Sequence, residues 1–164
     1  EDQPISKADI KNLATRCPNI THLGLRYCDI VDDLFLGNEL PKLWPHSLSS
    51  IDISNCPNVT ATGLRKLFGF VSSIKANSIR QTGRTLRLVR GGRTPIREGE
   101  IHMSGWRSVE SMHVECPRTV RFCLSRHQSL QAVTVIGLAA TWIDLYDCRL
   151  LNRVEFRCPN LTIL

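Results

Sequence analysis

The chain has 164 residues, of which 42% are hydrophobic, 22% charged and 6% aromatic. This length and apolar content fit one globular domain or a short repeat array with a sizeable core, and they exclude a disordered tail. No run of about 18 apolar residues occurs, and the start of the chain lacks a basic stretch followed by an apolar one. We therefore expect neither a membrane span nor an intact secretory signal.

The formal net charge is +6, from 21 Lys and Arg residues against 15 Asp and Glu residues. The excess lies between Lys75 and Arg97, a stretch without an acidic residue, and the rest of the chain is nearly neutral. The 7 cysteines form no Cys-x-x-Cys pair and no zinc-finger spacing. We expect free, mostly buried thiols in a reducing compartment, and hence an intracellular protein, cytoplasmic, nuclear or within an organelle.

Strand and helix patterns alternate in the first part of the chain. Ile10 and Leu13 have helical spacing. Residues 20–28 then read apolar-x-x-apolar-x-apolar-x-x-Cys, and residues 48–56 repeat this pattern 28 positions later. Such alternation puts one side chain inside and the next outside, as in a half-buried strand.

A short helix is predicted after each of these strands. Residues 60–68 offer hydroxyl groups at a helix start, followed by apolar Leu64, Leu67 and Phe68 at helical spacing. Asp32, Asp33 and Leu34 stand at the corresponding place in the preceding unit. The pattern thus predicts one strand and one short helix per repeat.

The middle of the chain is basic. Residues 85–90 alternate like a strand, Gly91 and Gly92 signal a turn, and alternation resumes towards Met103, so we expect residues 78–104 to form an irregular, hairpin-like excursion. This excursion would display five arginines together: Arg84, Arg87, Arg90, Arg93 and Arg97. Clustered arginines bind phosphate or carboxylate groups, so RNA or an acidic protein surface could be the partner, with a solvated loop as the alternative. The segment holds no aromatic residue for base stacking, which weighs against sequence-specific RNA binding.

The last third repeats every 21 residues. Columns of apolar residues keep this period, such as Met112, Val133 and Val154. A second alternating pattern lies between them, at residues 120–124 and 141–145. Each turn is therefore predicted to hold two short strands.

A Cys-Pro-Asn-apolar string begins at Cys17, Cys56 and Cys158, in phase with the strand pattern. These strings resemble the cysteine-containing leucine-rich repeats of F-box proteins, over residues 8–68 and, in shortened form, over 109–164. The resemblance implies an α/β solenoid, a short leucine-rich-repeat array with a strand and a short helix per repeat in the N-terminal part and compact two-strand turns in the C-terminal part. It also implies the substrate-recognition part of a ubiquitin-ligase adaptor, although nothing here resembles an F-box.

We expect residues 1–164 to form a single solenoid without polar caps, hence a segment of a longer protein or one whose ends another subunit covers. A solenoid presents the outward residues of its strands as a continuous face, where we expect the binding residues. Placing all the strand patterns side by side selects the following candidates: His22, Arg26, Asp52, His113, Glu115, Arg153, Glu155 and Arg157.

Signals for catalysis are weak. The histidines are scattered, and a thiol or metal site made of Cys116, Cys123 and His113 is disfavoured by its spacing. We predict no enzyme activity and no cofactor, and a protein-protein interaction module that binds another protein and no membrane. The alternative is a structural subunit of a large assembly whose arginine segment contacts RNA or an acidic neighbour.

Overall fold

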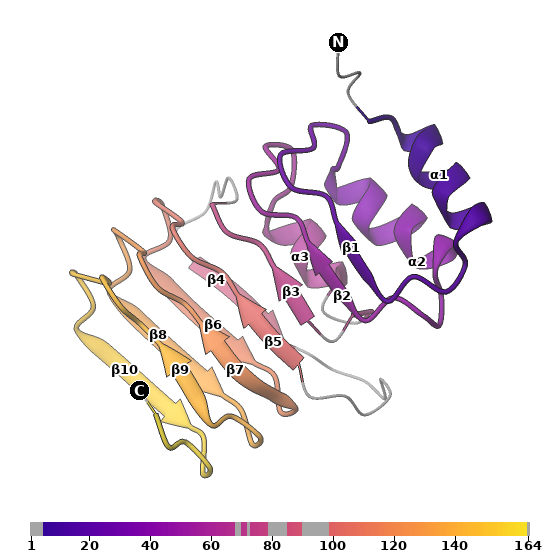
Figure 1. The fold of residues 1–164 in the computed structure, drawn as a ribbon. Coiled ribbons are helices and arrows are strands. Elements are labelled where there is room, and N and C mark those ends of the chain that lie inside the picture. Colours follow the sequence, from indigo (N-terminus) through magenta and orange to yellow (C-terminus); the bar gives the residue numbers. More distant parts are fainter. Residues whose placement is uncertain (1–4, 68–69, 72, 79–84, 90–98, 164) are drawn as a thin grey trace.

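The fold is a solenoid whose strands form two parallel sheets (Figure 1). We describe it from a computed structural model, which covers residues 5–67, 70–71, 73–78, 85–89 and 99–163. Sheet A contains, in order, β1 (His22–Gly24), β2 (Ser50–Asp52), β3 (Ser73–Lys75), β5 (Gly99–His102), β7 (Thr119–Cys123) and β9 (Trp142–Asp144). Sheet B contains β4 (Thr85–Val89), β6 (Ser111–Glu115), β8 (Ala132–Ile136) and β10 (Arg153–Arg157).

Helices take the place of sheet B behind the first strands of sheet A. They are α1 (Lys7–Arg16), the π-helix η1 (Phe35–Glu39), α2 (Leu40–Leu43) and α3 (Ala61–Leu67). Because α3 packs against β4, the helical layer continues directly into sheet B. A helix advances less per residue than a strand, so the turn from Leu23 to its partner Ile51 takes 28 residues and the two-strand turn from Phe122 to Ile143 takes 21.

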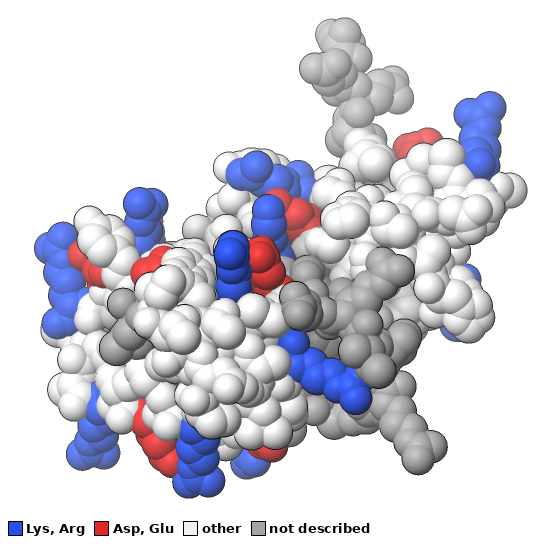
Figure 2. Space-filling model, turned by 60° about the horizontal axis from the view of Figure 1, so that its bottom comes forward, with Lys and Arg blue, Asp and Glu red and all other residues white. Residues whose placement is uncertain are grey.

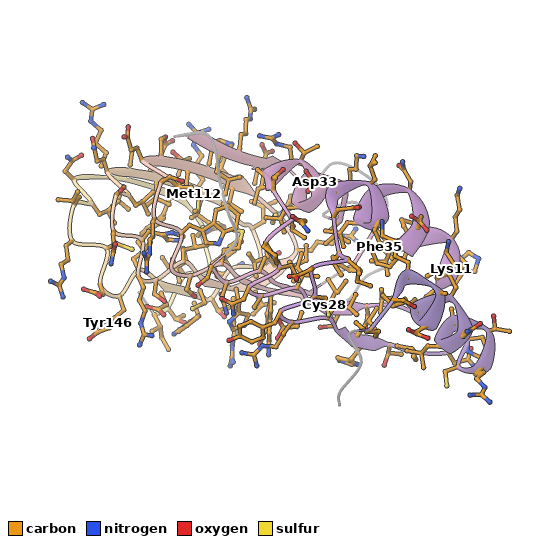
Figure 3. All side chains as sticks on the ribbon, turned by 90° about the horizontal axis from the view of Figure 1, so that it is seen from above. Lys11, Cys28, Asp33, Phe35, Met112 and Tyr146 are labelled. Atoms are coloured by element: carbon orange, nitrogen blue, oxygen red, sulfur yellow. The ribbon has the colours of Figure 1, made fainter. Side chains whose placement is uncertain are left out.

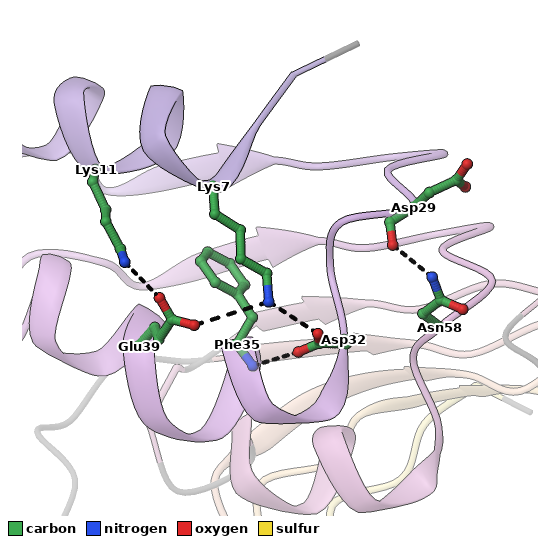
Figure 4. Close-up of polar contacts among 7 residues, drawn as sticks. All are labelled: Lys7, Lys11, Asp29, Asp32, Phe35, Glu39 and Asn58. Carbon is green, nitrogen blue, oxygen red and sulfur yellow. Dashed lines mark hydrogen bonds and ion pairs between the residues drawn. The ribbon is translucent and has the colours of Figure 1, made fainter.

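Polar contacts define the helix ends and hold the first helices together (Figure 4). Ser6 and Asp9 form a capping box at the start of α1. The backbone N–H of Phe35 donates to Asp32 Oδ1 at 2.6 Å, and Lys7 Nζ pairs with Asp32 Oδ2 at 2.9 Å. Ile10 of α1 is fully buried, whereas Leu13, predicted on the same face, is 36% exposed. The side chain of Leu13 therefore lies outside the core.

Apolar ladders between the two layers form the core. In sheet B, Met112 lies opposite Val133 and Val133 opposite Val154, as the 21-residue period predicts. In sheet A one ladder runs through the sheet: Leu23, Ile51, Ile74, Ile101, Phe122 and Ile143. Figure 3 shows Met112 between the layers. Val154 is 51% exposed, because β10 is the last strand of sheet B and no further strand covers it.

The prediction of a hairpin-like excursion at residues 78–104 is wrong for the strands that the structure describes. β4 pairs in parallel with β6 in sheet B, and β5 pairs in parallel with β3 and β7 in sheet A. β4 and β5 thus lie in different sheets, as consecutive strands do in the later turns. Residues 79–84 and 90–98 lie outside the described part of the chain.

Every described turn bends at one corner in the same way, just after the strand of sheet A. The residue four positions after the sheet A ladder has a positive φ: Tyr27, Asn55, Ser78, Gly105, Arg126 and Asp147. Where the structure describes the next residue, its side chain points inward. Among these side chains, Cys56 Sγ donates to the backbone oxygen of Leu25 at 2.9 Å and Cys148 Sγ to that of Leu124 at 3.3 Å. Both bonds reach the preceding turn, whereas Cys28, at the first described corner, donates to the backbone oxygen of Arg26 in its own turn at 3.5 Å.

The same corner position holds other donors in the middle of the solenoid. Trp106 Nε1 donates to the backbone oxygen of Ala76 at 2.8 Å, and His127 Nε2 lies 2.9 Å from that of Met103. None of the 7 cysteines forms a disulfide, as predicted, but only Cys56 and Cys116 are buried, so the expectation of mostly buried thiols is wrong. Within the described ranges, no helix has both the length and the hydropathy needed to cross a bilayer.

Candidate protein-interaction surface

The candidate binding residues do not share one face, because the strands on which they lie belong to different sheets. His22, Arg26 and Asp52 lie on or next to strands of sheet A, whereas the other candidates lie on sheet B. The second group consists of His113, Glu115, Arg153, Glu155 and Arg157. The continuous face that we predicted from sequence is therefore corrected to two separate faces.

The candidates on sheet B are largely paired with one another. Arg157 Nη2 lies 2.7 Å from Glu155 Oε1, and His113 Nε2 lies 3.8 Å from Glu115 Oε2. Of the basic segment, Arg87 is exposed on β4 next to His113. The remaining members, Arg84, Arg90, Arg93 and Arg97, lie outside the described residues. The RNA contact predicted for this segment finds no support in the described part of the chain.

On sheet A, Arg26 connects two neighbouring turns. Its Nε lies 3.9 Å from Asp52 Oδ2, and its guanidinium carbon lies 5.7 Å from the ring centre of Tyr27. Tyr27 is itself 68% exposed. The three groups form a mixed charged and aromatic edge at the start of the sheet.

The outward face of sheet A also carries residues that the sequence reasoning missed. Trp142 and Tyr146 both lie on this side, and Tyr146, which is 70% exposed, projects from the molecule in Figure 3. The signal was present: the alternation of residues 141–145 already marks Trp142 as outward. Trp142 was missed because the N-terminal strands were aligned with the strands of residues 112–114 and 133–135 and not with the strand of residues 141–145.

A groove of about 340 Å³ runs along the corner beside Tyr146. Its lining is polar and comes from four successive turns: Asn77, Ser78, Ser104, Gly105, Ser125, Arg126, Asp144 and Tyr146. Asn77 Oδ1 accepts hydrogen bonds from the N–H of Ser104 at 2.9 Å and from its hydroxyl at 3.0 Å. Such bonds between turns hold the groove in one shape in the absence of a partner.

Charges of both signs are interspersed on the described surface that Figure 2 shows. Figure 2 shows Lys and Arg side chains next to Asp and Glu side chains on the face in view. On sheet A this mixing is direct, since Arg121 Nη1 lies 3.6 Å from Glu100 Oε1. A surface of this kind suits recognition by scattered polar contacts around a few anchors.

Next to the groove, Cys123 lies among titratable side chains on the same face. It is the register partner of His102 on β5, and its Sγ lies 3.4 Å from Asp144 Oδ2 on β9. The interaction with the neighbouring His102 imidazole lowers the pKa of the Cys123 thiol, and the same interaction raises the pKa of His102. His102 Nε2 also contacts Glu100 Oε2 at 3.1 Å.

The disfavoured site of Cys116, Cys123 and His113 is not assembled. Cys116 is fully buried, and His113 lies on sheet B whereas Cys123 lies on sheet A. In the parts of the chain that the structure describes, no three His, Cys, Asp or Glu side chains are arranged to hold a metal ion.

Comparison with known proteins gives one partial likeness. F-box/LRR-repeat protein 5 of Salmo salar is 34% identical to this chain over 64 residues, which make up 38% of this chain and 9% of that protein. The chain therefore matches less than a tenth of the length of this curated relative. No protein-family model matches the chain, and no solved structure matches it.

Proposed function

We propose that this solenoid is a protein-binding module whose docking surface is the outward face of sheet A with its corner groove. The observation that carries the proposal is Tyr146, 70% exposed at the edge of the groove just after β9, with Trp142 at the start of the same strand. Tyr and Trp are the side chains that most often anchor protein interfaces, because they bury large areas at a small cost in conformational entropy.

The surroundings of these anchors support the same proposal. Ser54 and Ser125 are buried, at 3% and 7% exposure, and each accepts a hydrogen bond from a neighbouring turn: Ser54 Oγ from the N–H of Asn77 at 3.2 Å, and the backbone oxygen of Ser125 from the N–H of Gly105 at 3.1 Å. A surface held in this way loses little further freedom on binding, which favours affinity. The polar lining then offers donors and acceptors around the aromatic anchors.

We further propose that the module is non-catalytic. A thiol beside an imidazole could act as a nucleophile, but acyl transfer also needs donors for the oxyanion. The backbone N–H groups of Gly105 and Arg126, which lie at the groove, already donate to the carbonyls of Ser125 and Tyr146 at 3.1 and 2.7 Å. These two donors are therefore not free for a reaction intermediate.

The finer assignment is a leucine-rich-repeat array of the F-box/LRR type, acting as the substrate-recognition part of a ubiquitin-ligase adaptor. Three features support it: the Cys-Pro-Asn strings, the strand and helix alternation up to α3, and the partial likeness to a protein named F-box/LRR-repeat protein 5. The bound partner would then be a protein that is marked for ubiquitination.

The test is to capture partners with the tagged chain, identify them by mass spectrometry and measure Kd with the purified partner. Replacing Trp142 and Tyr146 together by Ala should weaken binding by tenfold or more, on the order expected for interface anchors. The matched control replaces Arg153 and Glu155 on sheet B by Ala and should leave Kd unchanged. Binding that survives the first double variant and is lost in the second would refute the proposal.

For the ubiquitin-ligase assignment, the captured partner is followed in cells that express the chain joined to an F-box. Its half-life should shorten with the wild-type chain and not with the double variant Trp142→Ala, Tyr146→Ala. An unchanged half-life with binding intact would reject the adaptor role and leave the docking surface in place.

A further inference from the structure

We propose that Cys123 is a modification site for soft electrophiles of the α,β-unsaturated carbonyl class, activated by His102 and Glu100. The three side chains lie on adjacent strands of one exposed sheet face. The proposal concerns covalent modification of the thiol and is independent of the partner-binding role.

The geometry is that of an activated nucleophile. Cys123 on β7 and His102 on β5 are register partners, so their side chains are neighbours on the outward face of sheet A. His102 Nε2 is in turn contacted by Glu100 Oε2 at 3.1 Å, so that a carboxylate stabilises the imidazolium. A thiol, an imidazole and an orienting carboxylate are the groups that favour a thiolate and imidazolium pair.

Further groups stabilise or oppose the thiolate. The hydroxyls of Ser125 and Ser104 lie 3.6 and 3.9 Å from Cys123 Sγ, and both can donate to a thiolate. Asp144 on β9 opposes ionisation, because the thiol donates to its carboxylate and the like charge disfavours a thiolate. Arg121, on the same strand as Cys123, is directed to Glu100 at 3.6 Å. With these neighbours together, the pKa of Cys123 is lowered.

The sulfur of Cys123 lies beside residues that line the groove. Ser104, Ser125 and Asp144, which all contact Cys123 Sγ, also line the groove of about 340 Å³. Cys123 itself is partly exposed, unlike Cys56 and Cys116, which are fully buried. A small electrophile therefore reaches this sulfur without unfolding of the solenoid.

The reaction balances with the groups present. The thiolate of Cys123 adds to the β-carbon of the electrophile and forms a C–S bond, while the π electrons of the C=C bond move to an enolate. The enolate takes its proton at the α-carbon from the His102 imidazolium, and the imidazole is left neutral. No group leaves, and no oxidant is required.

The test treats the folded chain with less than one equivalent of N-ethylmaleimide at neutral pH and locates the adduct by peptide mass spectrometry. Cys17 is the internal control, since it is exposed and accessibility alone would favour it. We expect the adduct to form on Cys123 first. As pH is raised, the labelling rate of Cys123 should begin to increase at a lower pH than that of Cys17. Labelling of Cys17 ahead of Cys123 over this pH range would overturn the proposal.

Two substitutions on the exposed face should act in opposite directions. His102→Gln should slow the labelling of Cys123 by about threefold for each unit by which its pKa rises, because the tenfold loss of thiolate is partly offset by higher nucleophilicity. Asp144→Asn should speed the labelling, and both variants should leave Cys17 unchanged. Far-ultraviolet circular dichroism checks that both variants are folded, and an unchanged ratio of the Cys123 and Cys17 rates in folded His102→Gln would contradict the assignment.

Discussion

His127 Nε2 lies 2.9 Å from the backbone oxygen of Met103, a residue of the preceding turn. A carbonyl oxygen only accepts, so Nε2 carries the proton, and Nδ1 is then free to accept from the N–H of Trp106 at 3.3 Å. The imidazole is fully buried, and this burial lowers its pKa below the ordinary value of 6.5. The folded protein therefore holds His127 in its neutral form.

This burial predicts loss of stability in mild acid. As pH falls below 6.5, the unfolded chain binds a proton at His127 before the folded chain does. The free energy of unfolding therefore decreases as pH falls from 6.5 to the lower pKa that His127 has in the folded protein. Urea unfolding at several pH values measures this loss. In His127→Gln, the side-chain amide can donate to Met103 but does not titrate. The free energy of unfolding of this variant should therefore change less with pH below 6.5. An equal slope in the two proteins would show that other groups cause it.

Trp106 offers a test of the corner hydrogen bonds. Trp106→Phe removes the N–H that donates to the carbonyl of Ala76 and leaves that buried oxygen without this partner. We expect the free energy of unfolding to fall by about 2 kcal/mol from the lost bond and the lost ring volume. Trp142→Phe on the outward face should cost less than half as much. Comparable losses in the two variants would refute the role of the indole N–H.

Along the apolar ladder of sheet B, we expect the cost of a Val→Ala substitution to fall towards the last strand. Val135 is fully buried, whereas Val154 is 51% exposed on β10. Val135→Ala should therefore destabilise the fold by about 2 kcal/mol through lost burial and a cavity, and Val154→Ala by well under 1 kcal/mol. Thermal or urea unfolding of the two variants measures the difference. A similar loss in the two variants would contradict this difference in burial.

The thiol of Cys56 should react only after unfolding. Burial raises its pKa to about 11, and its side chain is fully buried. Its labelling by an aromatic disulfide reagent at neutral pH should therefore follow the global unfolding rate as urea increases. Cys17, which is exposed, should react without urea. Reaction of both thiols at the same rate in the native state would contradict the buried corner.

The sequence predicted the register of the solenoid well, because each ladder keeps its period. The partners Met112 and Val133 are 21 residues apart, and Leu23 and Ile51 are 28 apart, as the patterns indicate. It did not predict which sheet a strand joins. An alternating five-residue strand looks the same in either layer, so β6 and β8 were aligned with β1 and β2 although they belong to the opposite sheet.

The corner column shows a second limit of pattern reading. The cysteine pattern identifies Cys28 and Cys56, but not Trp106 or His127 at the same position in later turns. At these corners a thiol, an indole and an imidazole each donate a hydrogen bond to the backbone of the preceding turn. The side chain at this corner therefore keeps its role as a hydrogen-bond donor although the residue type changes.

The exchange of the helical layer for sheet B at α3 and β4 also sets the curvature of the molecule. Packed helices stand about 8 to 10 Å apart, but paired strands stand only about 4.8 Å apart. Turns backed by helices are therefore wedge-shaped and bend sheet A away from the helices, whereas turns backed by strands stack nearly straight. A long ligand lying across both halves of sheet A must follow an arc over β1 to β3 and a straight path from β5 to β9.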